Sequence, residues 1–168
     1  MATILLIGND VLTRNSILGG NIDVDKLWPA VKACQKTLIK PLLGDDLYNK
    51  ICDDYFNDSL TGLYQEMYDD YIVDLVVYGT AAIYIGAGGA YQISNLGIVK
   101  ARTDNSETVS KAEVDYLYNF NKQLFDGLKE DFLKWIKDNP VTEYNNPCGV
   151  SNQRLFGGWL LSKTKRNC

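Results

Sequence analysis

The feature that most constrains the fold is a long amphipathic segment at residues 110–138. Ser110 and Glu113 have the spacing of a capping box, in which each side chain satisfies a free backbone N–H at a helix start. Apolar residues then recur every three or four positions, the spacing of one helix face: Leu117, Phe120, Leu124, Leu128, Phe132 and Trp135. Asn139-Pro140 ends the pattern. A long helix with one apolar side needs other helices to cover that side.

Three earlier segments also have helical patterns, at about residues 23–42, 45–56 and 61–85. Aspartates stand where the first two begin and can cap the free N–H groups of a first turn. Pro41 and Gly44 disrupt and end the first segment. The third is the most apolar, but its continuous apolar run, Tyr71–Ile85, is shorter than the roughly 20 residues needed to cross a bilayer. We therefore expect a buried core helix and no membrane association.

Between the third and fourth helices, residues 91–102 have the pattern of a β-hairpin. Tyr91 and Ile93 alternate with polar residues, Asn95 and Gly97 give a turn signal, and Ile98-Val99 are β-forming. The predicted fold is thus mainly α: a small four-helix bundle with a β-hairpin insertion and extended N- and C-terminal arms.

The predicted organisation is an N-terminal arm (1–22), a helical domain (23–139) and a C-terminal tail (140–168). The arm begins with an apolar run that a lone extended segment cannot bury, and its backbone groups need partners. The tail carries a second apolar cluster beyond the helices. We therefore predict contacts with neighbouring subunits through three groups of residues: Ile4, Leu5, Leu6 and Ile7; Tyr91, Ile93, Ile98 and Val99; and Phe156, Trp159, Leu160 and Leu161.

Composition excludes most catalytic chemistry. The chain has no histidine, which excludes a Ser-His-Asp triad and every zinc site that uses histidine. Its four cysteines form no C-x-x-C pair. The net charge of −4 argues against the phosphate-neutralising surface of a DNA-wrapping protein. We predict no enzymatic activity, no catalytic or metal-binding residues and no cofactor.

The order of four sequence elements resembles a known family. Residues 39–48 (IKPLLGDDLY) join two helices through the turn Pro41, Leu42, Leu43 and Gly44, and a long apolar helix follows. Residues 94–98 (SNLGI) come next, and then the Ser110-capped helix that ends in WIKDNP at 135–140. Over about residues 22–145 this layout is similar to the head–tail connector (adaptor, or neck ring) proteins of tailed phages, with most likeness to those of Bacteroidetes and crAss-like phages.

The resemblance implies a virion structural protein made in the host cytoplasm. It would form a homo-oligomeric ring, a dodecamer if it matches the portal, between the portal and the tail or further neck rings. A head-to-tail interface that closes on itself generates such a ring. DNA would pass through the ring without specific binding, and acidic helix faces would suit its lumen. The alternative is a cytosolic helical binding or regulatory module without catalytic activity.

Overall fold

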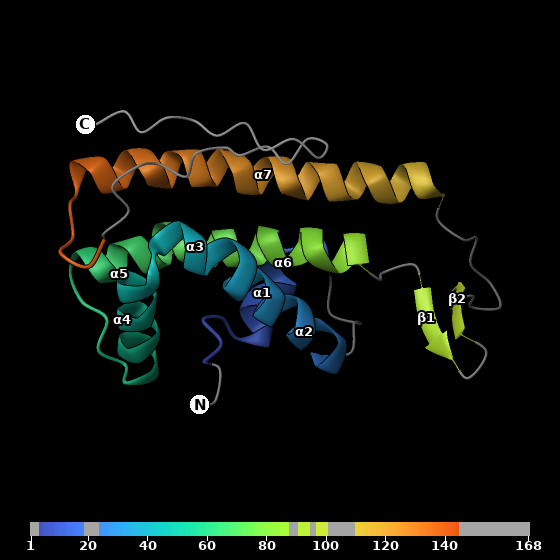
Figure 1. Ribbon diagram of the computed structural model, residues 1–168, viewed down its shortest axis with the longest axis horizontal. Helices are drawn as coiled ribbons and strands as arrows, with labels where there is room; N and C mark the ends of the chain where they lie inside the picture. Colours follow the sequence, from blue (N-terminus) through green and yellow to red (C-terminus); the bar gives the residue numbers. More distant parts are fainter. Residues whose placement is uncertain (1–3, 19–23, 88–90, 95–96, 101–109, 145–168) are drawn as a thin grey trace, which may run out of the picture.

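The computed structural model describes residues 4–18, 24–87, 91–94, 97–100 and 110–144, and these residues are mainly α-helical (Figure 1). The chain begins with a short helix, α1 (Asn9–Asn15). Helix α2 (Val24–Cys34) continues through a π-helical segment, η1 (Gln35–Ile39), into α3 (Lys40–Leu43). Helix α4 (Asp45–Phe56) follows after Gly44.

The second half of the molecule is built on two long helical runs. Helix α5 (Leu63–Met67) continues through the π-helical segment η2 (Tyr68–Ile72) into α6 (Val73–Ala87). Strands β1 (Tyr91–Ser94) and β2 (Gly97–Lys100) pair antiparallel, with Ile93 opposite Ile98. Helix α7 (Lys111–Asp138) then runs back along the molecule. Its predicted capping box is confirmed, because Ser110 Oγ accepts from the Glu113 N–H at 3.3 Å and Ser110 N–H donates to Glu113 Oε2 at 2.8 Å.

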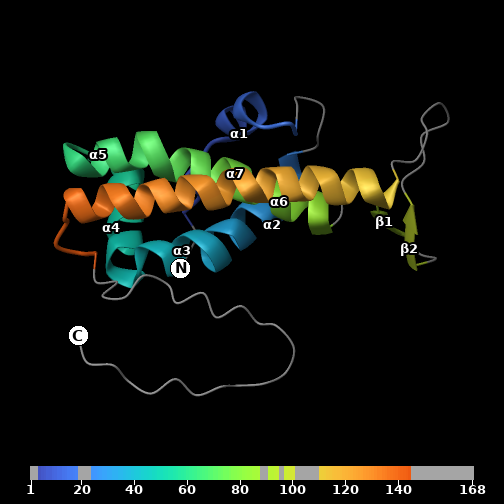
Figure 2. The same ribbon diagram turned by 90° about the horizontal axis from the view of Figure 1, so that it is seen from above.

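Helix α6 is the centre of the packing. It lies alongside α7 in both views, while α2 packs on it as well (Figures 1 and 2). Helix α4 is steeply inclined to this pair at the end where α5 begins. The largest fully buried side chains come from almost every helix; they include Leu12, Leu27, Ile39, Leu42, Leu43, Leu47, Ile51, Met67, Ile72, Leu75 and Phe132. All of them belong to one core cluster.

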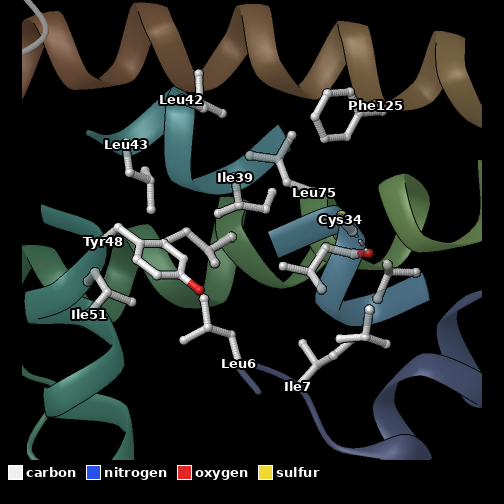
Figure 3. Close-up of a cluster of buried hydrophobic side chains, with 14 of the residues drawn as sticks. Leu6, Ile7, Cys34, Ile39, Leu42, Leu43, Tyr48, Ile51, Leu75 and Phe125 are labelled. Atoms are coloured by element: carbon white, nitrogen blue, oxygen red, sulfur yellow. Dashed lines mark hydrogen bonds between the residues drawn. The ribbon is translucent and has the colours of Figure 1, made fainter. Parts of the chain in front are cut away.

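The side of α7 that faces this core differs from the predicted one. The buried residues are Asn121, Phe125, Phe132 and Ile136, and Figure 3 shows Phe125 pointing into the cluster. Of the predicted stripe, Phe132 is the residue that belongs to the buried seam. Leu117 is 37% and Phe120 44% exposed, while Leu128 and Trp135 pack against the core only partly buried. Both sets have helical spacing, in steps of three, four or seven residues, so the sequence period fits either set. In the structure Phe125 packs against Gly79 of α6, where a Cβ would approach its ring to 3.2 Å.

The N-terminal residues are folded onto the core, which corrects the prediction of an extended arm. Leu6 is 0% and Ile7 2% exposed, and Figure 3 places both in the core cluster, with Leu6 beside Tyr48. Helix α1 follows immediately and buries Leu12. The apolar run therefore finds its partner within the same chain, which sequence reasoning did not anticipate.

A buried amide holds this segment in place. Gln35, fully buried in η1, accepts from the Leu6 N–H at 3.1 Å and donates to the Ile4 carbonyl at 3.0 Å. The same side chain donates to Tyr48 Oη at 3.0 Å, and Tyr68 Oη donates to the Leu6 carbonyl at 2.6 Å. Side chains thus satisfy the backbone groups that a neighbouring strand would satisfy in a sheet.

Replacing Gln35 should therefore destabilise the fold. In Gln35→Ala the buried Leu6 N–H loses its acceptor, so the free energy of unfolding should fall by about 1–3 kcal/mol in a urea titration. The control is Thr37→Ala in the same π-helical segment, whose exposed hydroxyl bonds only the Ala33 carbonyl. That change should stay within about 0.5 kcal/mol. We call the hydrogen bonds of Gln35 and Tyr68 to residues 4–6 the N-terminal clamp. Equal losses of stability in the two variants would contradict it.

Candidate interaction surfaces

The turn that carries the family resemblance has a structural role. Leu42 and Leu43 are buried at 2% and 0% exposure, and the Gly44 N–H donates to the Lys40 carbonyl at 2.9 Å. Gly44 has φ +82°, a conformation that glycine adopts at little cost, and α4 begins at the next residue. The turn therefore fixes the angle between α3 and α4 and presents no large apolar side chain to a partner.

The predicted contact residues separate into three outcomes. Leu6 and Ile7 are buried within the chain, which leaves little of their side chains for a neighbouring subunit, while Ile4 and Leu5 are half-buried against the core. Tyr91, Ile93, Ile98 and Val99 lie in β1 and β2, but their side chains are outside the described part of the structure. Phe156, Trp159, Leu160 and Leu161 lie outside the described residues altogether.

An apolar surface that sequence reasoning missed lies along the first half of α7. Tyr116 is 68%, Phe120 44% and Leu117 37% exposed, and the rings of Tyr116 and Phe120 stack with centroids 6.5 Å apart. Leu124 and Leu128 continue this side of the helix and are half-buried. We call these five residues the α7 flank. Its signal was present in the sequence as the apolar stripe, but that stripe was assigned to the core.

A shallow hollow lies at the α6–α7 contact, near the start of α7. It has a volume of about 480 Å³ and is lined by Ala82, Ile83, Gly86, Val114, Asp115 and Tyr118. Small residues of α6 form part of it, namely Ala82 and Gly86, and a Cβ at Gly86 would come within 3.0 Å of the Tyr118 ring. A single carboxylate, with no histidine, lysine or thiol among the lining residues, does not make a nucleophile–base pair.

The two thiols in the described residues are poor nucleophiles. Burial raises the pKa of Cys34 to about 12, and burial also raises the pKa of the less deeply placed Cys52. Reactive thiols need the opposite shift of the pKa.

The carboxylate of Asp74 is also perturbed by its surroundings. Burial, with a smaller contribution from the charge of Asp70, raises the pKa of Asp74. Within the described ranges, no group of three His, Cys, Asp or Glu side chains is placed to hold a metal ion.

The region around the α7 flank corresponds to a recognised sequence family. Residues 39–154 match DUF6712, a family of unknown function. The chain belongs to this family. No curated protein and no solved structure is significantly similar to it. The DUF6712 region includes the turn, the hollow and the whole α7 flank, whereas Leu6 and Gln35 of the N-terminal clamp precede it.

Two contacts within the DUF6712 region hold the residues that follow α7, Glu143 and Tyr144, against the domain. Tyr64 Oη donates to Glu143 Oε2 at 2.5 Å, and this bond raises the pKa of Tyr64 and lowers that of Glu143. The ring of Tyr144 meets Phe132 edge-on, with centroids 6.3 Å apart. Tyr144, the last described residue, is therefore held in place at the α5 end of the molecule (Figure 1). No helix among the described residues is long and apolar enough to span a membrane.

Proposed function

We propose that this chain is a virion structural protein, a subunit of the ring that joins the portal of a tailed phage to its tail and continues the DNA channel. The observation that carries the proposal is the α7 flank. Three large apolar side chains, Tyr116, Leu117 and Phe120, stand exposed within two turns of one helix. Grouped apolar exposure of this kind is typical of a surface that another protein covers.

The energetics of the flank favour a partner. Burying apolar area stabilises an assembly by roughly 25 cal/mol per Å², so these side chains could contribute several kcal/mol per interface before the costs of association. A closed ring forms the same interface at every subunit boundary and leaves no unpaired end. A weak contact between two free subunits is therefore compatible with a stable ring.

In finer detail, we propose a four-helix bundle made of α2 to α3, α4, α5 to α6, and α7, with a β-hairpin insertion at 91–102 and a C-terminal arm. The resemblance to head–tail connectors supports a dodecamer that binds the portal on one side and the tail or another neck ring on the other. Acidic side chains such as Asp69, Asp70 and Asp74 would suit a lumen through which DNA slides. The ring would need no cofactor and would catalyse no reaction.

The test is the location of the protein in purified particles of the phage that encodes it. Quantitative mass spectrometry should find it at about twelve copies per particle, the number expected if it matches the portal ring. Cryo-electron microscopy should place a ring with the described helices directly between the portal and the tail. A host-cell metabolic enzyme should be absent from the same particles and serves as the control.

The alternative function predicts a different result. A cytosolic helical binding or regulatory module would be present in infected-cell extracts and missing from washed particles. That distribution would overturn the proposal, as would a ring density whose helices do not match α6 and α7.

A further inference from the structure

The α7 flank is a narrow surface of definite length. Leu117, Phe120, Leu124 and Leu128 are three or four residues apart, so they follow one side of the helix for about 16 Å. Gly127 lies on the same side, and a Cβ at this position would meet nothing within 4 Å. The surface at Gly127, beside the flank, is therefore open among the described residues.

The C-terminal tail starts within reach of this surface. Tyr144 is held against Phe132 near the end of α7, and about 15 Å of helix separates Asp138, the last helical residue, from the level of Leu128. Residues 145–155 can span at most about 36 Å when extended. The next six residues are the apolar cluster Phe156-Gly-Gly-Trp159-Leu160-Leu161, about 20 Å long when extended. Both the reach and the length of this cluster match the flank.

We propose that, in the free subunit, residues 156–161 of the same chain cover the α7 flank, running antiparallel to α7. The tail follows directly after Tyr144, and its length and its apolar side chains fit the flank. A second copy could offer the same cluster. However, a short tether gives an effective concentration in the millimolar range, which exceeds micromolar solution concentrations. At such concentrations contact within one chain is therefore favoured over contact between chains.

This contact concerns the free subunit and does not depend on the ring. In the ring proposed above, residues 156–161 of one subunit would instead cover the α7 flank of a neighbouring subunit, as in domain swapping. The tail would then cover the flank before assembly and connect subunits after it.

A photo-crosslinker tests the contact directly. p-Benzoylphenylalanine placed at Phe120 in the full chain should cross-link to residues 153–163, and peptide mapping of the monomer band should identify the product. The control places the same group at Asn119, which is exposed and about 100° away around the helix. We expect the cross-link yield at position 120 to exceed that at 119 at least about fivefold, because tethering concentrates the tail at one side.

Three outcomes would overturn the proposal. Equal yields at the two positions would show that the tail has no preferred site. Tail cross-links confined to the dimer band would identify a second copy as the occupant. Cross-links from position 120 to the helical domain alone would show that the tail lies elsewhere. Each outcome is read in the free subunit, so none of them bears on whether the protein occurs in particles.

A second measurement changes only the tail and leaves the folded domain intact. The double variant Trp159→Ser/Leu160→Ser should uncover the flank, and binding of the dye ANS to exposed apolar surface should rise at least about twofold. The matched control, Lys163→Ser/Lys165→Ser, removes charge from the same tail and should leave dye binding unchanged. An unchanged signal in the first variant, or an equal rise in both, would contradict cover by the apolar cluster.

Discussion

Phe132→Ala should reduce the free energy of unfolding by about 3–5 kcal/mol, because it empties a fully enclosed site in a packed core. Phe132 has 0% exposure and lies at the centre of α7's buried seam. Its ring contacts Tyr71, with centroids 6.0 Å apart, and the edge of Tyr144. The loss should therefore affect both the packing of η2 on α7 and the position of Tyr144 after the helix. Urea unfolding followed by circular dichroism measures it.

The matched control lies on the same helix. Phe120→Ala removes the same side chain from a position that is 44% exposed, outside the seam, so its cost should be about 1 kcal/mol or less. A small loss at Phe120 with a large loss at Phe132 would separate the core side of α7 from the flank. If the two variants lose equal stability, then Phe120 is part of the core, and the flank would not be a surface awaiting a partner.

The presence of the helices could be predicted from local chemistry, and the prediction of a mainly helical chain is confirmed. Helix α7 begins at Lys111, as the Ser110–Glu113 spacing indicated, and α4 begins at Asp45, one of the expected aspartates, although its N-cap is Gly44 and no side chain caps it. Both signals act within one turn, since a cap satisfies free N–H groups and a glycine permits a positive φ. Such signals need no knowledge of the rest of the fold.

The side of α7 that is buried could not be read from the same pattern. The predicted stripe and the observed seam are both helical in period and share only Phe132 of the predicted residues. Asn121 belongs to the seam although it is polar, because its side chain donates to the Leu117 carbonyl at 2.8 Å within the helix. Because the seam side of α7 faces the core, the apolar side chains of Leu117 and Phe120 remain exposed. A large apolar residue on a helix is therefore not by itself evidence that its side faces the core of the same chain.

The contacts of the N-terminal segment with Gln35 could not be predicted from the sequence for a different reason. Leu6 and Gln35 are 29 positions apart, and no periodic pattern connects them. The available signal was a polar residue, Gln35, four positions after Val31 and seven before Leu42, on the apolar side of the helical segment. A buried amide at such a place is stable only if it has partners. Nothing local indicated that those partners would be the backbone of the N-terminal segment.

Deleting residues 1–8 and deleting residues 153–168 should both keep the protein out of particles, but only the first deletion should unfold the domain. The first deletion removes Leu6 and Ile7, whose burial contributes roughly 1.5–3 kcal/mol each, and leaves the Gln35 amide without its backbone partners. The sum is comparable to the roughly 5–15 kcal/mol that stabilises a typical domain, so this variant should be largely unfolded in circular dichroism at 37 °C. It should be missing from particles because it does not fold.

The second deletion should leave the domain folded, because residues 4–144 supply the described core cluster, and the free energy of unfolding should fall by no more than about 1–3 kcal/mol as the tail's cover of the flank is lost. In the proposed ring, however, the α7 flank would lose the segment that connects neighbouring subunits. The copy number in purified particles should therefore fall at least about tenfold, which corresponds to a loss of about 1.4 kcal/mol per subunit contact. Folded protein incorporated at the wild-type copy number would show that the tail does not hold subunits together, whereas loss of folding would mean that it belongs to the core. Only a folded subunit that no longer enters particles supports the assignment of the tail as the connection between subunits.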